Sequence, residues 1–461
     1  MLSQTVIREF QQVLGAENVM TEEADRHAYS YDSAVLEPVI PALVLRPPTT
    51  EALGRCVRLC SDNRLPITVR GAGTNLSGGT IPSKEQGVVI VTNGLNRIVE
   101  LSVEDLYAVV QPGVITAHFA HAAAEKGLFY PPDPGSQTVS TLGGNVAENA
   151  GGLRGLKYGV TKDYVMGVDF FDTNGELVSS GSKTVKCATG FNLSDLMVGS
   201  EGMLGVFSEI TLKLIPPPQA HKAMLAVFDS VDKASETVSA IIAEKIVPCT
   251  LEFLDNFTIR TVEDFRRAGL PVDADALLLI EVDGHPAEVE EDAAKVHDIC
   301  LRLGAREVSF AETDEQRDRV WQARRDALPA LARLKPTTVL EDATVPRSKI
   351  PAMVKAINEI GAKHGLTIGT FGHAGDGNLH PTILTDRRDK DEFARVEQAI
   401  EEIFEQALNL DGTLSGEHGI GLAKSKFMER EVGLGTILYS KRIKEALDPH
   451  TLLNPGKSFG A

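Results

Sequence analysis

Hydrophobic and polar positions alternate in two different ways along the chain, and the change falls near residue 219. In the first half, MLSQTVIREFQQVLG has the spacing of an amphipathic helix, and a second helical pattern runs over residues 50–63. Short apolar runs bounded by glycine, proline and polar residues predict strands, such as LPITVR and the hairpin VMGVDFFDTNGELVSS. Long glycine-rich passages separate these elements.

Beyond residue 219, strand and helix patterns alternate and glycines are few. This alternation predicts an antiparallel sheet with helices on one side, which would form a separate, cap-like domain. The strands are expected in AMLAVF, TLEFLD, ALLLIEVDG and REVSFAET. Further helices are expected around residues 312–334, 349–363, 390–409 and 435–447.

The stretch FGHAGDGNLH, residues 371–380, predicts a hairpin that carries candidate ligand side chains. Strands over 367–373 and 378–384 would be joined by AGDG, with Gly375 and Gly377 supplying the positive φ that such turns need. Residues that face each other across a hairpin share a side of the sheet, and so do alternate residues along a strand. The hairpin therefore presents a His, an Asn and a second His on one face.

These side chains are His373, Asn378 and His380, and SGEHGIG supplies Glu417 and His418 about forty residues later. Neutral imidazoles and a carboxylate are common ligands of zinc, manganese or iron, so His373, His380 and Glu417 predict a divalent-metal site with open positions. His418 would then be free to move protons. The alternative is a glycine-rich hairpin with surface histidines.

Two glycine-rich passages predict a cofactor site in the first half. RGAGTNLSGG, residues 70–79, follows a predicted strand, and such a turn presents backbone N–H groups to an anion. It is not the Rossmann dinucleotide fingerprint, because G-x-G-x-x-G followed by an amphipathic helix is absent. A plain loop is the alternative. Residues 129–159 form a second polar, glycine-rich passage, and such passages are usually functional.

Composition narrows the class of protein. With 461 residues, 43% of them hydrophobic and 24% charged, the chain is expected to be globular, with two domains. Its net charge of −18 would repel phosphate backbones and anionic lipid, so no nucleic-acid partner is expected, and at most peripheral membrane association through a partner. Five scattered cysteines predict neither a disulfide framework nor an iron–sulfur cluster. No apolar run approaches the roughly 18 residues of a membrane span, and we expect a cytoplasmic protein.

Six ordered stretches resemble one family: RGAGTNLSGG, PPDPGSQTVSTLGGNVAENAGG, GSEGMLGVFSEITL, GHAGDGNLHP, SGEHGIG and LDPHTLLNPGK. Together they are similar to FAD-linked oxidoreductases of the vanillyl-alcohol oxidase superfamily. Within it they most resemble the group that holds the FAD subunit of glycolate oxidase, with D-lactate and D-2-hydroxyglutarate dehydrogenases as relatives. The resemblance extends from about residue 35 to the end of the chain.

The resemblance implies an α+β fold with three parts. Residues 1–217 would form a two-subdomain FAD-binding domain of the vanillyl-alcohol oxidase type. Residues 218–414 would form a ferredoxin-like antiparallel substrate (cap) domain that carries the metal hairpin. Residues 415–461 would return to the flavin site.

The resemblance also implies where FAD binds. The loop 70–79 would bind the pyrophosphate, residues 131–152 would run beside the ribityl chain and isoalloxazine, and residues 201–206 would lie by the adenine end. Some relatives attach FAD covalently through His or Cys, but the first loop contains neither, so we expect non-covalent FAD. The implied flavin contacts are Gly71, Gly73, Thr74, Asn75, Ser77, Gly78, Pro132, Gly135, Ser136, Thr141, Gly144, Asn145, Gly152, Glu201, Gly202, Val206 and Asn454.

For the substrate, the resemblance implies that Arg324 pairs with a carboxylate and that the metal is held by the same His, His and Glu. Asn378 would orient the substrate, and His418 would remove its hydroxyl proton. Relatives that act on 2-hydroxyglutarate carry further Thr and Lys residues where this chain has Leu328 and Leu340. A dicarboxylic acid is therefore disfavoured.

The leading interpretation is an FAD-dependent dehydrogenase of a small D-2-hydroxy acid, D-lactate or glycolate. It would form the 2-oxo acid by hydride transfer to flavin N5 with metal assistance. Electrons would then pass to an electron-transferring flavoprotein or an iron–sulfur protein. The alternatives are a metal-dependent hydrolase whose glycine loops bind a nucleotide, and a non-catalytic flavin subunit of an electron-transfer complex.

Overall fold

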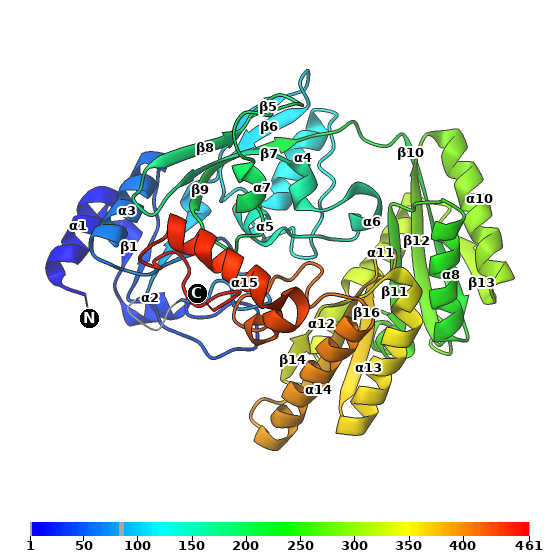
Figure 1. Ribbon diagram of the computed structural model, residues 1–461. Helices are drawn as coiled ribbons and strands as arrows, with labels where there is room; N and C mark the ends of the chain where they lie inside the picture. Colours follow the sequence, from blue (N-terminus) through cyan, green and yellow to red (C-terminus); the bar gives the residue numbers. More distant parts are fainter. Residues whose placement is uncertain (1, 83–86, 461) are drawn as a thin grey trace. The chain divides into compact units, whose positions relative to one another are not determined.

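The computed structural model describes residues 2–82 and 87–460 (Figure 1). The chain divides into two compact units. Unit 1 consists of Met1–Gly151, Val160–Pro217 and Glu417–Ala461, and unit 2 consists of Gly152–Gly159 and Pro218–Gly416. The boundaries 1–217, 218–414 and 415–461 stay a prediction.

Unit 1 contains two sheets. The first has the order β1 (Val19–Met20), β2 (Leu43–Leu45), β4 (Val88–Val91), β3 (Ile67–Arg70), and β2, β4 and β3 run parallel. The second is antiparallel, with the order β5 (Ile98–Ser102), β6 (Tyr107–Val110), β9 (Val206–Lys213), β7 (Val165–Phe171), β8 (Leu177–Gly181). The helices are α1 (Gln4–Leu14), α2 (Glu23–His27), α3 (Thr50–Asp62), α4 (Thr116–Glu125), α5 (Leu142–Glu148), α7 (Leu193–Met197) and α15 (Met428–Leu447).

Each sheet of unit 1 has its own hydrophobic core. Helices α1 and α3 pack on the first sheet. The Thr49 hydroxyl caps α3 by accepting from the Ala52 N–H at 3.2 Å, and the helix buries Leu53, Val57 and Cys60. Helices α4 and α5 pack with the second sheet in a separate cluster. Strand β3 pairs in parallel with β4 and ends at Arg70, where the predicted phosphate-binding loop begins. The first sheet therefore positions this loop.

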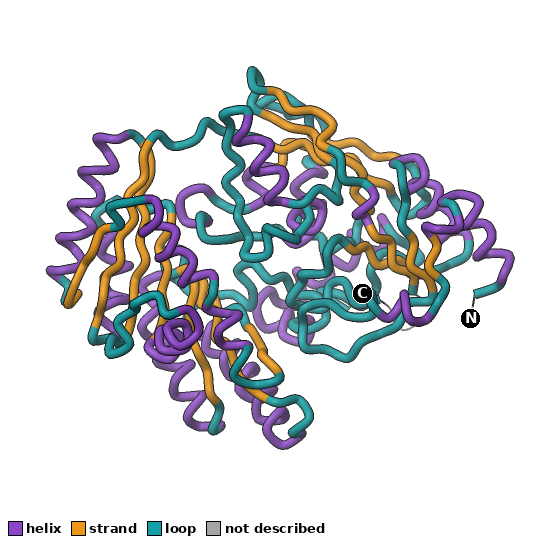
Figure 2. The backbone as a smooth tube through the Cα atoms, turned by 180° about the vertical axis from the view of Figure 1, so that it is seen from behind, coloured by secondary structure: helices purple, strands orange, loops and turns teal. Residues whose placement is uncertain are grey.

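Unit 2 is built on an eight-stranded sheet. Its order is β13 (Ala305–Phe310), β10 (Ala220–Phe228), β12 (Ala276–Gly284), β11 (Thr250–Asp255), β16 (Thr367–His373), β17 (Asn378–Thr385), β14 (Thr337–Leu340), with β15 (Ala343–Thr344) also paired to β17. All these pairings are antiparallel. The helices are α6 (Gly155–Tyr158), α8 (Val231–Ala243), α9 (Asn256–Arg266), α10 (Pro286–Arg302), α11 (Asp314–Arg325), α12 (Ala327–Ala332), α13 (Ile350–His364) and α14 (Lys390–Asn409). Figure 2 shows the strands in orange between purple helices.

Helices cover both faces of this sheet, so the prediction of helices on one side is wrong. On β16, a Cβ added to Gly369 would touch Leu331 of α12, whereas the next residue back, Ile368, contacts Gly361 of α13. Neighbouring residues of a strand point to opposite faces, so α12 and α13 lie on opposite sides. Strands buried on both sides read as continuous apolar runs, as ALLLIEVDG does, and such a run does not reveal how many helices cover it.

One predicted helix differs from the structure. The helix expected over residues 312–334 is two helices, α11 and α12, which are separated at Asp326. Pattern alone missed this break because the apolar spacing continues across it. The predicted final helix, 435–447, is the part of α15 that follows the non-helical residue Gly433, which has a φ of 73°.

Candidate active site

Helix α11 is tied to one face of the cap sheet by two buried carboxylates. Glu281 of β12 accepts from the Trp321 Nε1–H at 2.5 Å and from two nitrogens of Arg317 at 3.0 and 2.7 Å. One turn further on, the Arg324 Nε–H donates to Glu252 of β11 at 2.6 Å. Positions 317, 321 and 324 lie on one side of a helix, so these contacts fix both the rotation of α11 and the place of its last arginine.

Glu252 bridges Arg324 and a predicted metal ligand. Its Oε2 accepts from Arg324 Nε, and its Oε1 lies 2.8 Å from His373 Nδ1. The carboxylate is 0% exposed. Burial alone would raise the pKa of Glu252, but His373 and Arg324 outweigh it and hold the pKa below its ordinary value. The carboxylate is therefore ionised and accepts a hydrogen bond from each neighbour.

Arg324 keeps part of its guanidinium available. The residue is 7% exposed, and its plane lies over the Phe371 ring, 4.7 Å from the centroid. Within residues 2–82 and 87–460, Nε is the nitrogen that donates to a protein acceptor, and the two terminal nitrogens donate to none. A buried, stacked guanidinium with unused terminal donors is suited to a planar anion such as a carboxylate.

The predicted histidine hairpin is confirmed. Strands β16 and β17 pair with His373 opposite Asn378 and Phe371 opposite His380, as the alternation required. The two imidazoles are perpendicular, with ring centroids 5.1 Å apart. The Asn378 Oδ1 atom is buried and has no hydrogen-bond partner in the described part of the chain. A buried acceptor of this kind is suited to a ligand donor.

The glycines of the turn differ from the prediction in one respect. Gly377 has a φ of 87°, as expected, and a Cβ there would lie 2.0 Å from the Val345 carbonyl oxygen. Gly375 is not in the left-handed region, and the expectation of a positive φ is wrong. Its constraint is packing, because a Cβ would lie 2.5 Å from Leu156 Cδ2.

The second half of the predicted metal motif begins at the boundary between the units. Gly416, the last residue of unit 2, has no room for a side chain, because a Cβ would lie 2.3 Å from Thr344 Oγ1 and 2.6 Å from Asn378 Nδ2. Glu417 is the next residue along the chain and is assigned to unit 1. Two imidazoles and this carboxylate are groups that could hold a metal ion.

In unit 1, the loop after β3 is held in shape by hydrogen bonds to one of its own side chains. The Asn75 Oδ1 accepts from the Ser77 and Gly79 N–H groups at 2.9 and 2.7 Å, which folds the loop back on itself. Gly71 has no room for a side chain, because a Cβ would lie 2.1 Å from Thr141 Oγ1. The two glycine-rich passages that the sequence singled out therefore meet at this point.

The C-terminal segment reaches the same loop. The Asn454 amide donates to the carbonyl oxygens of Gly79 and Glu201 at 2.9 and 2.6 Å. The Glu201 carboxylate in turn accepts from the Ile420 and Gly421 N–H groups at 2.8 and 2.7 Å, which holds the residues just after His418. Unit 1 thus gathers three of the predicted motifs around one loop.

A cavity lies at this meeting point, and its lining includes four predicted flavin contacts and Glu148, which sequence reasoning missed. The predicted contacts are Gly71, Gly144, Glu201 and Gly202. Burial, and then the nearby Glu201, raises the pKa of Glu148 well above its ordinary value. Its signal in the sequence was a lone acidic residue within the glycine-rich passage NVAENAGG.

The positions of the remaining predicted flavin contacts do not support a flavin role by themselves. Val206 is fully buried in the first core of unit 1, and Gly152 belongs to unit 2. The others lie in the two glycine-rich passages of unit 1: Gly73, Thr74, Ser77, Gly78, Pro132, Gly135, Ser136 and Asn145. Their roles stay predictions.

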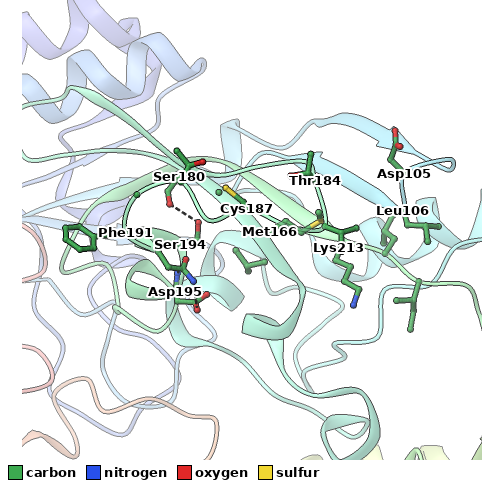
Figure 3. Close-up of a pocket in the computed structure, with 18 residues that line it drawn as sticks. Asp105, Leu106, Met166, Ser180, Thr184, Cys187, Phe191, Ser194, Asp195 and Lys213 are labelled. Carbon is green, nitrogen blue, oxygen red and sulfur yellow. Dashed lines mark hydrogen bonds between the residues drawn. The ribbon is translucent and has the colours of Figure 1, made fainter.

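A second cavity of about 400 Å³ lies elsewhere in unit 1, under the segment that follows β8 (Figure 3). The Ser194 hydroxyl bonds to the Ser180 hydroxyl at 3.1 Å on one wall. Cys187 and the highly exposed Phe191 stand along its rim. None of the predicted site residues lines it, so its size does not make it the catalytic site.

Across the described residues, no helix is long and apolar enough to cross a membrane.

Comparison with known proteins gives two family matches. Residues 41–181 match the family described as "FAD binding domain", and residues 217–458 match the family described as "FAD linked oxidases, C-terminal domain". The glycolate oxidase subunit GlcD of Bacillus subtilis (strain 168) is 50% identical over 459 residues, which are 100% of this chain and 97% of the relative. GlcD of Escherichia coli (strain K12) is 41% identical over 97% of this chain and 89% of the relative. A D-lactate dehydrogenase of Anaerostipes hadrus is 32% identical over 98% and 96%.

Solved structures agree on the fold. The structure of p-cresol methylhydroxylase with substrate bound matches with a TM-score of 0.81 at 17% identity, over 99% of this chain and 98% of that one. A 4-ethylphenol oxidase from Gulosibacter chungangensis matches with a TM-score of 0.80 at 16% identity, over 98% and 96%. The predicted α+β fold, with a vanillyl-alcohol oxidase-type FAD-binding domain and an antiparallel cap, is confirmed.

Proposed function

Because this chain belongs to the FAD-linked oxidases, a family of flavin-dependent oxidoreductases, we propose that it is a dehydrogenase of a small D-2-hydroxy acid, D-lactate or glycolate. The product is the 2-oxo acid. Two kinds of relative support this substrate class, since their names are glycolate oxidase subunit and D-lactate dehydrogenase. The observation that carries the proposal is the buried Arg324, whose terminal donors are unused beside two imidazoles on one sheet face.

Arg324 binds the substrate carboxylate in this proposal. Its Nε is occupied by Glu252, so the terminal nitrogens make the contact, and stacking on Phe371 keeps the guanidinium plane fixed. Asn378 orients the substrate through its amide. Leu328 and Leu340 pack against the hydrophobic core of the cap, and neither can hold a second carboxylate. A monocarboxylic acid is therefore favoured.

The donor set fits a divalent metal. His373 has Nδ1 bound to Glu252, so Nε2 carries the lone pair, and His380 and Glu417 are the other ligands proposed. Such an ion, zinc, manganese or iron, supplies Lewis acidity at the substrate hydroxyl. Glu417 is delivered by the chain itself, because it is bonded to Gly416, which lies against Asn378.

Residues of unit 1 supply the rest of the chemistry. The glycine-rich loops would hold FAD without a covalent link, and the flavin would supply the hydride acceptor for the α-hydrogen of the acid. His418 removes the hydroxyl proton as general base. Its backbone is held by the neighbouring residues 420 and 421, whose N–H groups donate to Glu201.

Electrons leave to a partner protein, either an electron-transferring flavoprotein or an iron–sulfur protein. The support is that two of the similar proteins are named as subunits, and that the five cysteines lack the repeated spacing of a cluster. Rapid reoxidation of the reduced flavin by air would contradict this part of the proposal.

An anaerobic flavin-bleaching screen tests the function. D- and L-lactate, glycolate, 2-hydroxybutyrate and 2-hydroxyglutarate are added in turn, with and without chelator, and absorbance in the flavin bands is followed. We expect bleaching by D-lactate or glycolate that is lost after chelation and restored by added metal. Colourless protein that still turns over would favour a metal-dependent hydrolase. Flavin that no hydroxy acid bleaches would favour a non-catalytic subunit.

A further inference from the structure

We infer that Glu252 is a positioning residue that joins the substrate-binding arginine and a metal-ligand histidine into one hydrogen-bonded unit. This inference rests on the proposed function, because it takes the roles of Arg324 and His373 from it. It lies in the middle of the central strand β11, between Leu251 and Phe253, and is 0% exposed.

Only a carboxylate satisfies both neighbours of this position. Arg324 Nε can only donate, and Oε2 accepts from it at 2.6 Å. The His373 Nδ1 lies 2.8 Å from Oε1, the second oxygen of the group that is paired with the permanently charged Arg324 guanidinium. A carboxylate paired in this way offers acceptor oxygens, so the ring N–H is placed to donate to it. Glutamine has the same length, but it would turn an NH₂ group toward one of the two donors.

The bond to His373 decides which ring nitrogen can bind metal. A proton held on Nδ1 by Glu252 leaves the lone pair on Nε2, so the imidazole is fixed in the tautomer that a ligand needs. The ring orientation is fixed by the same bond. Glu252 thus prepares the histidine before any metal arrives.

The bond to Arg324 decides where the substrate carboxylate lies. With Nε held by Glu252 and the guanidinium plane stacked on Phe371, the two terminal nitrogens have one allowed direction. Because one carboxylate holds both groups, the distance between the carboxylate-binding arginine and the metal ligand is set by Glu252.

The experiment compares Glu252→Gln with a matched variant, Asp255→Asn. Asp255 is also a fully buried carboxylate of β11, but it caps α9 through Thr258 and accepts from Thr370, and as a residue three positions away it faces the other side of the sheet. Both variants lose one buried charge on the same strand. A purely structural role for Glu252 would make them behave alike.

Two quantities are measured on folded FAD-loaded protein. For Glu252→Gln we expect zinc or manganese affinity, from competition with a chelator, to fall by about 10- to 100-fold. The hydroxy-acid concentration for half-maximal bleaching should rise by roughly tenfold, since a charge-assisted hydrogen bond to Arg324 is lost. Asp255→Asn should leave both quantities within about twofold of the unsubstituted protein. Equal metal affinity in Glu252→Gln and the unsubstituted protein would overturn the inference.

The third measurement needs no folded variant of Glu252. Proton–nitrogen correlation spectra of metal-free protein with ¹⁵N-labelled histidine report the tautomer of His373, which is assigned by the signal lost in His373→Gln. We expect the proton on Nδ1, and a proton on Nε2 would overturn the inference even if Glu252→Gln does not fold. If the unsubstituted protein neither binds metal nor bleaches, the proposed function fails instead, while the tautomer still reports on the Glu252 contact.

Discussion

Lys444 is a buried cation that holds the C-terminal segment of unit 1, and its removal gives a sharp test of how that segment is built. The ammonium is 1% exposed and donates to the carbonyl oxygens of Met203 and Leu453 at 2.7 and 2.6 Å and to Asp448 Oδ2 at 2.5 Å. Asp448 is itself fully buried. Leu453 directly precedes Asn454, which bonds to the glycine-rich loop at Gly79, so this contact links the last helix to the predicted flavin site.

Lys444→Met removes the cation and leaves its partner charge buried. Asp448 keeps two backbone donors, the N–H groups of Leu452 and Leu453 at 2.9 and 2.7 Å, but loses its counter-ion. Breaking a buried pair on one side costs about 3–5 kcal/mol, and we expect the free energy of unfolding to fall by that amount. Because Asn454 follows Leu453, FAD should also dissociate more readily.

The assay is equilibrium unfolding in urea, with FAD release followed by its fluorescence. Lys441→Met on the same helix is the control, because Lys441 makes no ion pair in the described part of the chain, and it should change stability by less than about 0.5 kcal/mol. Adding Asp448→Asn to Lys444→Met should restore part of the loss, since no uncompensated charge then remains. A loss under about 1 kcal/mol in Lys444→Met would refute the reasoning.

Three further outcomes are expected. Arg324→Lys keeps the charge but loses the planar guanidinium, whose separate N–H groups serve Glu252 and the substrate together. Half-maximal flavin bleaching should therefore need about 10- to 100-fold more hydroxy acid. An unchanged requirement would contradict the carboxylate contact. Burial raises the pKa of Asp255 to about 6, so the folded state holds this proton more tightly than the unfolded state, and the stability it gives is present at low pH and lost as pH rises through 6. Urea unfolding should therefore show Asp255→Asn gaining about 2 kcal/mol relative to the unsubstituted protein between pH 4 and pH 7. Parallel profiles would contradict this. Gly421→Ala places a Cβ 2.3 Å from the Ser77 carbonyl oxygen at a φ of 49°. FAD affinity should therefore drop by about tenfold or more in a fluorescence titration. Unchanged affinity would show that this loop does not contribute to FAD binding.

The sequence pattern predicted those parts of the site whose residues lie close together along the chain. The hairpin of His373 and His380 follows from strand alternation and a glycine turn, both of which operate within about ten residues. The loop at 70–79 follows from a strand that ends in glycines. These features needed no knowledge of distant segments.

Glu252 could not be found in this way. Its partners lie 72 and 121 residues further along the chain, and only the order of strands in the sheet brings them together. The one available signal was an acidic residue between the apolar Leu251 and Phe253, and burying such a residue is costly unless it is paired. The covering of both sheet faces and the break at Asp326 were missed for the same reason, since neither changes the local spacing of apolar residues.

The break at Asp326 separates the helix that carries Arg324 from the helix that carries Leu328. Arg324 ends α11, which buried carboxylates anchor to the sheet, whereas Leu328 lies in α12, a distinct helix with its own packing. A substitution in α12 is therefore expected to change the packing of that helix while Arg324 keeps its hydrogen bond to Glu252.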